Sequence, residues 1–312
     1  MKYLFIINPA AGKKDTSEAI LEQANIVFGS GNYDYYLTKG KLDAYHYTKE
    51  YIEKVEGKLA IIACGGDGTL NEVGSACIMK DNVYLACFPV GSGNDYIKAF
   101  GERENFIDLS YFKGNYDIKK VDVLEVNDRY ALNVCNIGFD AVVVHYMEKL
   151  RRMPLVSGKM AYHLAVFLGI FSRLSKPMLI MKDGKEFFNN KAILAVCANG
   201  NYYGGSYYVG PDALVDDGLL DLVVAKKVTR FTLARLIKRY QKGIFKKDKA
   251  CQKIFSFDTA KEVVIEGKKD LWYTVDGELL KANKIKVGVL ERALNFIYPK
   301  GLRRIKNGIW ES

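Results

Sequence analysis

Three short segments of this sequence combine glycine with polar side chains in a way that suits phosphate chemistry. They read NPAAGK over Asn8–Lys13, GGDGTLNE over Gly65–Glu72 and PVGSGND over Pro89–Asp95, and each follows a short apolar run. Glycine lacks a Cβ atom, so backbone N–H groups can approach phosphate oxygens closely. The N-terminus of a following helix adds its positive dipole end. The three segments therefore predict a phosphate-binding site.

Asp67 is the unexpected residue, because a carboxylate inside a glycine run repels phosphate. A divalent cation between the two removes that repulsion, and oxygen ligands suit magnesium. We therefore expect Asp67 to face a magnesium ion. Two familiar phosphate loops do not fit: NPAAGKKD lacks the first glycine and the final hydroxyl residue of a Walker A motif, and the dinucleotide fingerprint begun by Gly91 and Gly93 has tyrosine at position 96.

The elements that must position these segments follow from the alternation of the first 120 or so residues. The short apolar runs YLFIINP, YDYYLT, LAIIAC and VYLACFPV are separated by stretches of helical periodicity, such as Ser17 to Phe28 and Ala44 to Val55. Strands that alternate with helices predict a parallel sheet in an α/β domain. Open sheets of this kind bind ligands at the carboxyl ends of their strands, where all three glycine segments would lie.

From about Val121 the pattern changes to short strands close together, among them VDVLEV, ILAVCANG, LLDLVVA, VVIEG, WYTV, IKVGVL and LNFIYP. Such a run predicts an antiparallel sandwich or barrel-like domain. Two helical inserts interrupt it, one from about Val142 to Arg173 and one from Phe231 to Gly243. A length of 312 residues also suggests two domains.

The net charge of +10 calls for an anionic partner. Nucleic acid is disfavoured, because the basic clusters Arg151–Arg152, Arg235–Lys249 and Lys300–Lys306 contain no recognised reading element. The six scattered cysteines indicate reduced core residues in a cytoplasmic protein. The sequence shows neither a signal peptide nor an apolar stretch of the roughly 20 residues that span a bilayer.

The three segments, in this order, resemble the diacylglycerol kinase catalytic-domain family and in particular its soluble bacterial lipid kinases. Further motifs of that family follow in sequence: N-x-G-F-D at Asn136–Asp140, D-D-G-L-L-D-L at Asp216–Leu222 and D-G-E at Asp276–Glu278. Two positions depart from the family pattern, with Tyr96 in place of phenylalanine and Ser92 in place of a frequent threonine. The resemblance covers essentially the whole chain.

The resemblance implies an α/β ATP-binding domain over residues 1–122 and 295–312, a β-sandwich domain over residues 123–294, and an active site in the cleft between them. ATP contacts are implied for Asn8, Pro9, Ala10, Ala11, Gly12, Thr38, Gly65, Gly66, Asp67, Gly68, Thr69, Leu70, Asn71 and Ser92. Asp67 would face the catalytic Mg2+, and Glu278 would be the general base that takes the proton from a lipid hydroxyl.

A structural magnesium site is also implied, formed by the carboxylate of Asp217 and the main-chain carbonyls of Leu214 and Leu219. Lys13 and Asp95 would link this site to the nucleotide through charge pairing. As a bare tripeptide, D-G-E also fits a simple hairpin turn between WYTV and the next strand.

The acceptor implied by the resemblance is a lipid alcohol, most simply diacylglycerol. The stretch Tyr146 to Pro177, with its basic and apolar residues, could form a surface for peripheral contact with an anionic membrane, although it also fits an ordinary core helix. Two other functions stay open: an NAD kinase-like enzyme, and a catalytically inactive nucleotide-responsive membrane-binding protein. The strand-rich second domain could offer an edge for a homodimer.

Overall fold

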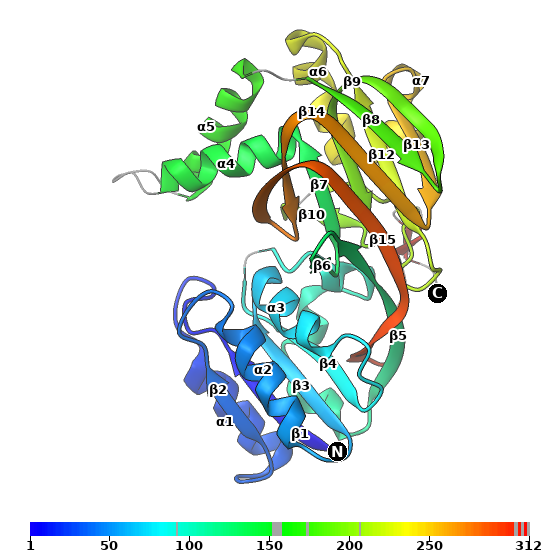
Figure 1. Ribbon diagram of the computed structural model, residues 1–312. Coiled ribbons are helices and arrows are strands. Elements are labelled where there is room, and N and C mark those ends of the chain that lie inside the picture. Colours follow the sequence, from blue (N-terminus) through cyan, green and yellow to red (C-terminus); the bar gives the residue numbers. More distant parts are fainter. Residues whose placement is uncertain are drawn as a thin grey trace.

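The computed structural model of the chain describes residues 1–91, 93–151, 158–172, 175–205, 207–302, 305–306 and 309–310 (Figure 1). Residues 1 to about 120 form the lower part of the view and most of the remaining chain forms the upper part. None of the helices in the described residues is long and apolar enough to cross a membrane. All six cysteines are free and buried, as the sequence predicts.

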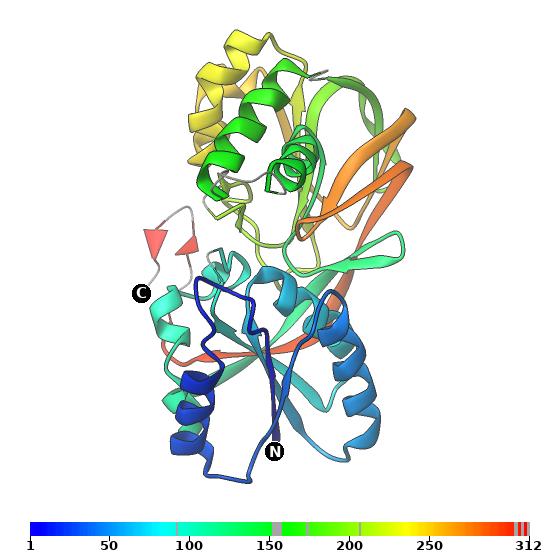
Figure 2. The ribbon, with the colours of Figure 1, turned by 90° about the vertical axis from the view of Figure 1, so that its left-hand side faces the viewer.

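The first part is a parallel α/β unit. Its strands are β1 (Lys2–Ile7), β2 (Asp34–Leu37), β3 (Leu59–Gly65) and β4 (Val83–Pro89), in the order β2-β1-β3-β4. Helix α1 (Ser17–Phe28) lies on one side of the sheet, and α2 (Asp43–Lys54) and α3 (Asp67–Cys77) lie on the other (Figure 2). Three short 3-10 helices follow: η1 (Tyr96–Ala99), η2 (Arg103–Phe106) and η3 (Leu109–Lys113). The predicted parallel sheet is confirmed.

Alternation along the strands explains why helices cover both faces of this sheet. In β1, Leu4 and Ile6 are buried in the cluster that holds Leu70 of α3, whereas Phe5 and Ile7 are buried with Ile20 of α1. Successive side chains of a strand point to opposite faces, so a strand that is apolar throughout needs cover on both. Each strand end is thereby held next to a helix start.

The second part is antiparallel, with a sandwich-like core. It contains β6 (Arg129–Ala131), β7 (Val134–Gly138), β8 (Lys176–Lys182), β9 (Lys185–Ala198), β12 (Leu220–Lys226), β13 (Phe255–Ala260) and β14 (Glu262–Val275). Both β7 and β8 pair with β9 and with β14, so these four strands enclose apolar side chains between them. The predicted β-sandwich class is confirmed.

Helices and small hairpins complete this part. The helices are α4 (Phe139–Arg151), α5 (Gly158–Phe171), α6 (Arg230–Gln241), η4 (Ile244–Lys246) and α7 (Lys249–Gln252), and one hairpin is formed by β10 (Tyr202–Tyr203) and β11 (Tyr207–Tyr208). The strands β16 (Ile305–Lys306) and β17 (Ile309–Trp310) form a separate two-stranded sheet near the C-terminus. The insert predicted from about Val142 to Arg173 contains two helices, and the first begins earlier than expected, at Phe139.

Two strands run through both parts and join them into one sheet. β5 (Tyr116–Val126) and β15 (Glu278–Pro299) pair antiparallel along most of their length, and Asn295–Ile297 of β15 also pair parallel with Tyr84–Ala86 of β4 (Figure 1). The runs IKVGVL and LNFIYP, which look like two strands in the sequence, belong to this one strand. The division at residues 122–123 and 294–295 stays a prediction.

Asp122 fixes the point at which the two strands change from one part to the other. β15 has a register shift between Leu290 and Leu294, and Arg292 there has a positive φ of 52°. The buried carboxylate of Asp122 accepts hydrogen bonds from the backbone N–H of Arg292 and of Gly218, both at 2.7 Å. It thereby satisfies backbone groups that the irregular strand and the 209–219 loop leave unpaired.

We expect Asp122→Ala to lower the free energy of unfolding by about 2–4 kcal/mol, because it leaves two enclosed N–H groups without an acceptor. The control is Asp81→Ala: this carboxylate is 92% exposed and pairs with Lys120 across the surface, where such a pair contributes about 0–1 kcal/mol. Urea denaturation of both variants measures the difference. Equal losses would contradict the role given to Asp122.

Candidate active site

The three glycine segments meet at the carboxyl ends of β1, β3 and β4. Asn8, which follows β1, donates from Nδ2 to the hydroxyl of Thr69 in α3 at 3.1 Å. Asn94, from the third segment, donates from Nδ2 to the carbonyl of Gly65 at 3.0 Å. Thr38 donates its backbone N–H to the carbonyl of Ile7 at 2.8 Å, which places it beside the first segment. Four loops therefore share one edge of the sheet.

Glycine is required where these loops touch. A Cβ atom on Gly91 would lie 2.6 Å from the Cα atom of Gly66, and one on Gly12 would lie 2.9 Å from the carbonyl oxygen of Val90. Gly12 also has a φ of +81°, which disfavours any other residue. The backbones approach closely enough to leave main-chain N–H groups, rather than side chains, at the surface of this edge.

Asp67 begins α3 at the centre of the edge. Its Oδ1 atom accepts hydrogen bonds from the backbone N–H of Asp95 at 2.6 Å and of Tyr96 at 3.4 Å. A Cβ atom on Gly93 would lie 2.8 Å from the Oδ2 atom of Asp67, so only glycine at this position leaves space beside the second carboxylate oxygen. Burial and, next, the charge of Asp95 raise the pKa of the Asp67 carboxyl, and the amides oppose this.

A second carboxylate, Asp276, joins the two parts of the molecule. Asp276 and Gly277 form the two-residue turn between β14 and β15, and their φ angles of 44° and 90° fit the turn type that Asp-Gly favours. The carboxylate accepts backbone hydrogen bonds from Leu132 at 2.7 Å and Val134 at 2.8 Å, and a side-chain bond from Asn71 of α3 at 2.9 Å.

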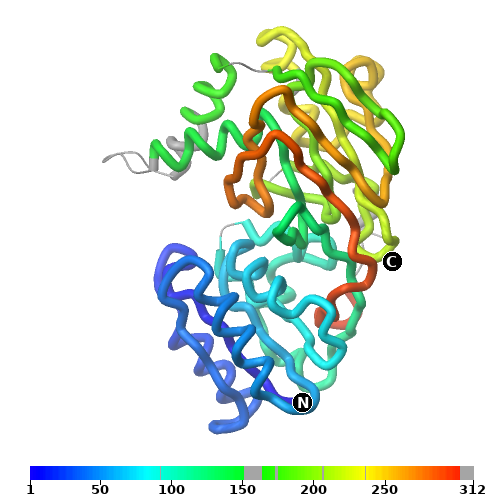
Figure 3. The backbone as a smooth tube through the Cα atoms, viewed as in Figure 1, coloured from blue at the N-terminus to red at the C-terminus, as the bar shows by residue number. Residues whose placement is uncertain are grey.

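These bonds place the tip of the β14–β15 hairpin above α3, as Figure 3 shows. Burial raises the pKa of the Asp276 carboxyl to about 6, and the charge of Asp67 contributes in the same direction. The sequence placed Asp276 in the D-G-E motif but gave this aspartate no role of its own.

Glu278 is the first residue of β15 and lies between two cations. Its Oε1 atom accepts a hydrogen bond from Lys41 at 2.9 Å, and its Oε2 atom lies 3.7 Å from a guanidinium nitrogen of Arg129. Lys41 belongs to the α/β unit, so this pair also crosses between the two parts. Glu278 lies two residues after Asp276. Asp276 accepts a hydrogen bond from Asn71, which lies one turn of α3 after Asp67. The structure thus brings Asp67 and Glu278 to the same interdomain junction.

Asp95 connects the glycine edge to the second part of the molecule. Its Oδ1 atom pairs with Lys98 at 2.6 Å, and its Oδ2 atom accepts the backbone N–H of Gly205, in the β10–β11 turn, at 2.8 Å. The carboxylate is therefore engaged on both oxygens, while Lys13 is exposed. The expected link from Lys13 through Asp95 stays a prediction. Ser92 lies outside the described residues.

The residues proposed for the structural metal lie together in the 209–219 loop. Asp217 is exposed, and its Oδ1 atom accepts the backbone N–H of Leu219 at 3.1 Å. Burial and the nearby charges of Asp221, Asp122 and Asp216 raise the pKa of its carboxyl, and the Leu219 amide opposes this. Among the described residues, no three His, Cys, Asp or Glu side chains form a metal cluster. A site with Leu214 would therefore depend on carbonyls.

The sequence also missed a polar cluster beneath the β10–β11 hairpin. Asp140, at the start of α4, accepts a hydrogen bond from the hydroxyl of Tyr203, which lies 3.3 Å from the hydroxyl of Tyr240 in α6. Burial raises the pKa of the Asp140 carboxyl to about 6, against the effect of the Tyr203 bond. The only available signal was the aspartate at the end of N-x-G-F-D.

Comparison with known proteins gives independent evidence. Residues 2–126 match the family model described as "Diacylglycerol kinase catalytic domain", and residues 133–298 match the model "YegS C-terminal NAD kinase beta sandwich-like domain". A "Probable lipid kinase YegS-like" of Alcanivorax borkumensis is 30% identical over 264 residues, covering 83% of this chain and 84% of that protein. A "Diacylglycerol kinase" of Bacillus subtilis is 29% identical over 70% of each chain.

A solved structure of a diacylglycerol kinase from Bacillus anthracis superimposes with a TM-score of 0.71 over 96% of this chain and 98% of that one. The two sequences are 24% identical, so this likeness establishes the fold alone.

We expect Asp140→Asn to change how stability depends on pH. A carboxyl group whose pKa is raised on folding lowers the stability of the folded protein as pH rises from about 4 to about 6. The amide keeps the acceptor for Tyr203 and carries no charge. Relative to that of the wild type, the free energy of unfolding of the variant should therefore rise by on the order of 1–3 kcal/mol between these pH values.

Urea denaturation at several pH values from 4 to 7.5 measures this difference. Asp128→Asn serves as the control, because the Asp128 side chain is 86% exposed. A difference between wild type and Asp140→Asn that stays constant with pH would show that the charge of Asp140 does not limit stability.

Proposed function

We propose that this chain transfers the γ-phosphoryl group of ATP to the hydroxyl of a lipid. The premise is that the chain belongs to the family of diacylglycerol kinases and YegS-like lipid kinases. Diacylglycerol or a related lipid alcohol is the proposed acceptor. The observation that carries the proposal is the bond between Asp276 and Asn71. It holds the hairpin of Glu278 over the helix that starts at Asp67.

The glycine edge supports nucleotide binding. The β3–α3 turn presents main-chain N–H groups without Cβ atoms at Gly66 and Gly68, directly at the N-terminus of an 11-residue helix. Both features favour anionic oxygens. We place the triphosphate here, between the Asn8–Gly12 loop and the loop after β4, with Thr69 and Asn71 oriented by their bonds to Asn8 and Asp276.

Magnesium fits the same edge. The backbone N–H groups of Asp95 and Tyr96 bond to Oδ1 of Asp67, whereas Oδ2 faces the space beside Gly93. An enclosed carboxylate with a second one, Asp95, nearby favours a hard cation over an approaching phosphate. Asp67 would hold this ion, which when bound would neutralise charge on the phosphate oxygens.

Glu278 has the position of a general base. In the proposed reaction it takes the proton of the lipid hydroxyl, the hydroxyl oxygen bonds to the γ-phosphorus, and the bond from that phosphorus to the β–γ bridging oxygen breaks to release ADP. Lys41 and Arg129 each contact one of the two carboxylate oxygens of Glu278 and thereby orient its side chain. Lys41 comes from the α/β unit, so formation of the base depends on the arrangement of both parts.

We further propose peripheral contact with an anionic membrane through the exposed aromatic residues of α5 and α6. Phe167 and Phe171 have ring centroids 4.7 Å apart and are 56% and 62% exposed, and Phe231 is 78% exposed. Arg230 donates to the carbonyls of Ile170 and Ser172, which places Phe231 beside the end of α5.

Charge supports the same surface, because α6 carries four basic and no acidic residues: Arg230, Arg235, Lys238 and Arg239. Each such residue near an anionic leaflet adds on the order of 1 kcal/mol. Of the basic residues first expected to contact the membrane, Arg152 and Arg173 lie outside the described residues, and so do the side chains of Arg151 and Lys159.

The test of the function is transfer of radiolabelled phosphate from ATP to a panel of lipid alcohols. We expect a phosphorylated lipid product, and at least a 100-fold loss of turnover in Glu278→Gln with ATP binding retained. Glu266→Gln is the control, since Glu266 lies on the same hairpin and pairs at the surface with Lys284. Turnover of NAD without a lipid product would overturn the proposal, and an active Glu278→Gln variant would remove Glu278 from its role.

We expect Phe171→Ser with Phe231→Ser to weaken binding to vesicles of phosphatidylglycerol and phosphatidylcholine by about tenfold for each residue, from the lost apolar burial. The control is Ile26→Ser, which removes a side chain that is 76% exposed on α1. Vesicle sedimentation gives the affinities. Binding as strong as that of the wild type would exclude this surface from the contact.

A further inference from the structure

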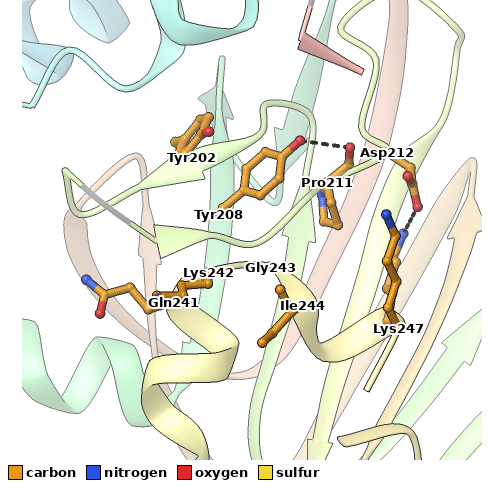
Figure 4. Close-up of a pocket in the computed structure, with 10 residues that line it drawn as sticks. Tyr202, Tyr208, Pro211, Asp212, Gln241, Lys242, Gly243, Ile244 and Lys247 are labelled. Atoms are coloured by element: carbon orange, nitrogen blue, oxygen red, sulfur yellow. Dashed lines mark hydrogen bonds and ion pairs between the residues drawn. The ribbon is translucent and has the colours of Figure 1, made fainter. Parts of the chain in front are cut away.

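A pocket in the second part of the molecule is not used by the proposed reaction. It has a volume of about 590 Å³ and lies between the β10–β11 hairpin and the segment that joins α6 to η4 (Figure 4). This volume is in the range of small-molecule sites. One wall consists of Tyr202 and Tyr208, whose rings stack with centroids 4.6 Å apart, and the other contains Lys242, Lys246 and Lys247.

The charges of this pocket favour an anion. Its lining has three lysines and one carboxylate, Asp212. Lys246 pairs with Asp212 at 2.8 Å and with Asp221 at 3.1 Å, so its charge is compensated. Lys242 and Lys247 are exposed, and the ion pairs formed within the described part of the chain do not include them. Two ammonium groups therefore remain for a ligand.

The tyrosine wall connects this pocket to the candidate active site. The Tyr202 ring lies 5.2 Å from the ammonium group of Lys98, which also pairs with Asp95 and donates to the carbonyl of Gly205. The backbone N–H of Asp95 in turn bonds Asp67. Displacement of Tyr202 would thus reach Asp67 through Lys98 and Asp95.

A second connection leads to the hairpin of Glu278. Asn133 donates from its side chain to the carbonyl of Tyr202 at 2.6 Å and from its backbone N–H to the carboxylate of Asp276 at 3.1 Å. The β10 strand is therefore connected to Asp276 through Asn133, and to Asp67 through Lys98 and Asp95. A ligand that repositions this strand acts on both sides of the catalytic site.

We propose that the pocket walled by Tyr202, Tyr208, Lys242 and Lys247 is a second binding site, for a phosphate monoester, and that its occupancy is coupled to the nucleotide site through the β10–β11 hairpin. The ester is either a free small molecule or the headgroup of a phosphorylated lipid. Binding to the pocket is independent of the kinase reaction, whereas the coupling rests on the proposed nucleotide site.

The probes are inorganic phosphate, glycerol 3-phosphate and the water-soluble dihexanoyl phosphatidic acid, each titrated calorimetrically into the full chain. The variant is Lys242→Glu with Lys247→Glu. Its control is Lys249→Glu with Lys253→Glu, which makes the same charge change at exposed positions of the same segment outside the pocket. We expect wild type and control to bind, and the Lys242/Lys247 variant to bind at least tenfold more weakly.

Equal affinity for glycerol 3-phosphate and the short-chain lipid would identify the free ester as sufficient, and binding of the lipid alone would identify the headgroup; either supports the site. Absence of binding to the wild type, or equal losses in both double variants, would overturn it. Failure of lipid phosphorylation leaves these binding results unchanged, so the two proposals fail separately.

The coupling is tested by the affinity for a non-hydrolysable ATP analogue with and without saturating glycerol 3-phosphate. We expect a change of at least about fivefold in the wild type, absent in the Lys242/Lys247 variant. Direct competition at the nucleotide site would persist in that variant and would contradict the coupling. An unchanged affinity in the wild type would also contradict it.

Discussion

The carboxylate of Asp276 is the constraint on which the geometry of this molecule depends. It accepts backbone hydrogen bonds from residues that begin the second part of the chain and a side-chain bond from Asn71 in the α/β unit. One turn thus satisfies groups from two segments that are distant in the sequence. Separation of the two parts would break the bond from Asn71, one of the bonds that offset the desolvation of this carboxylate. The junction is stable only when it is complete.

A second carboxylate, Asp122, makes the junction rigid from the opposite side. β5 and β15 carry a continuous sheet from one part to the other, and Asp122 satisfies the irregular backbone where β15 changes register. The two parts are therefore held by paired strands on one side and by the hairpin tip on the other. The role proposed for Glu278, which reaches from the second part to Lys41 of the first, requires a frame that fixes both parts.

Local patterns in the sequence were sufficient to predict the α/β unit and the glycine edge, because a glycine-rich segment between an apolar strand and a helix, such as GGDGT, is a local signal of a strand–turn–helix unit. They did not reveal the roles of Asp276, Asp122 or Asp140. Each of these carboxylates bonds residues distant in the sequence, and a single aspartate carries no signal of its partner. The continuity of β14 and β15 was missed for a related reason: both strands contain a register shift that breaks their alternation.

The β10–β11 hairpin shows how the same frame can transmit a signal. Each of its strands has two residues, so the hairpin is too short to be stable alone. It is held by hydrogen bonds with Asp95, Asn133 and Asp140, which come from three different segments. An element with little stability of its own and several external anchors takes the position that its contacts favour. Two of those anchors lead to Asp67 and Asp276. The proposed coupling therefore requires that a ligand at the hairpin binds with a free energy that depends on the proposed nucleotide site, and by reciprocity that the nucleotide affects this ligand equally.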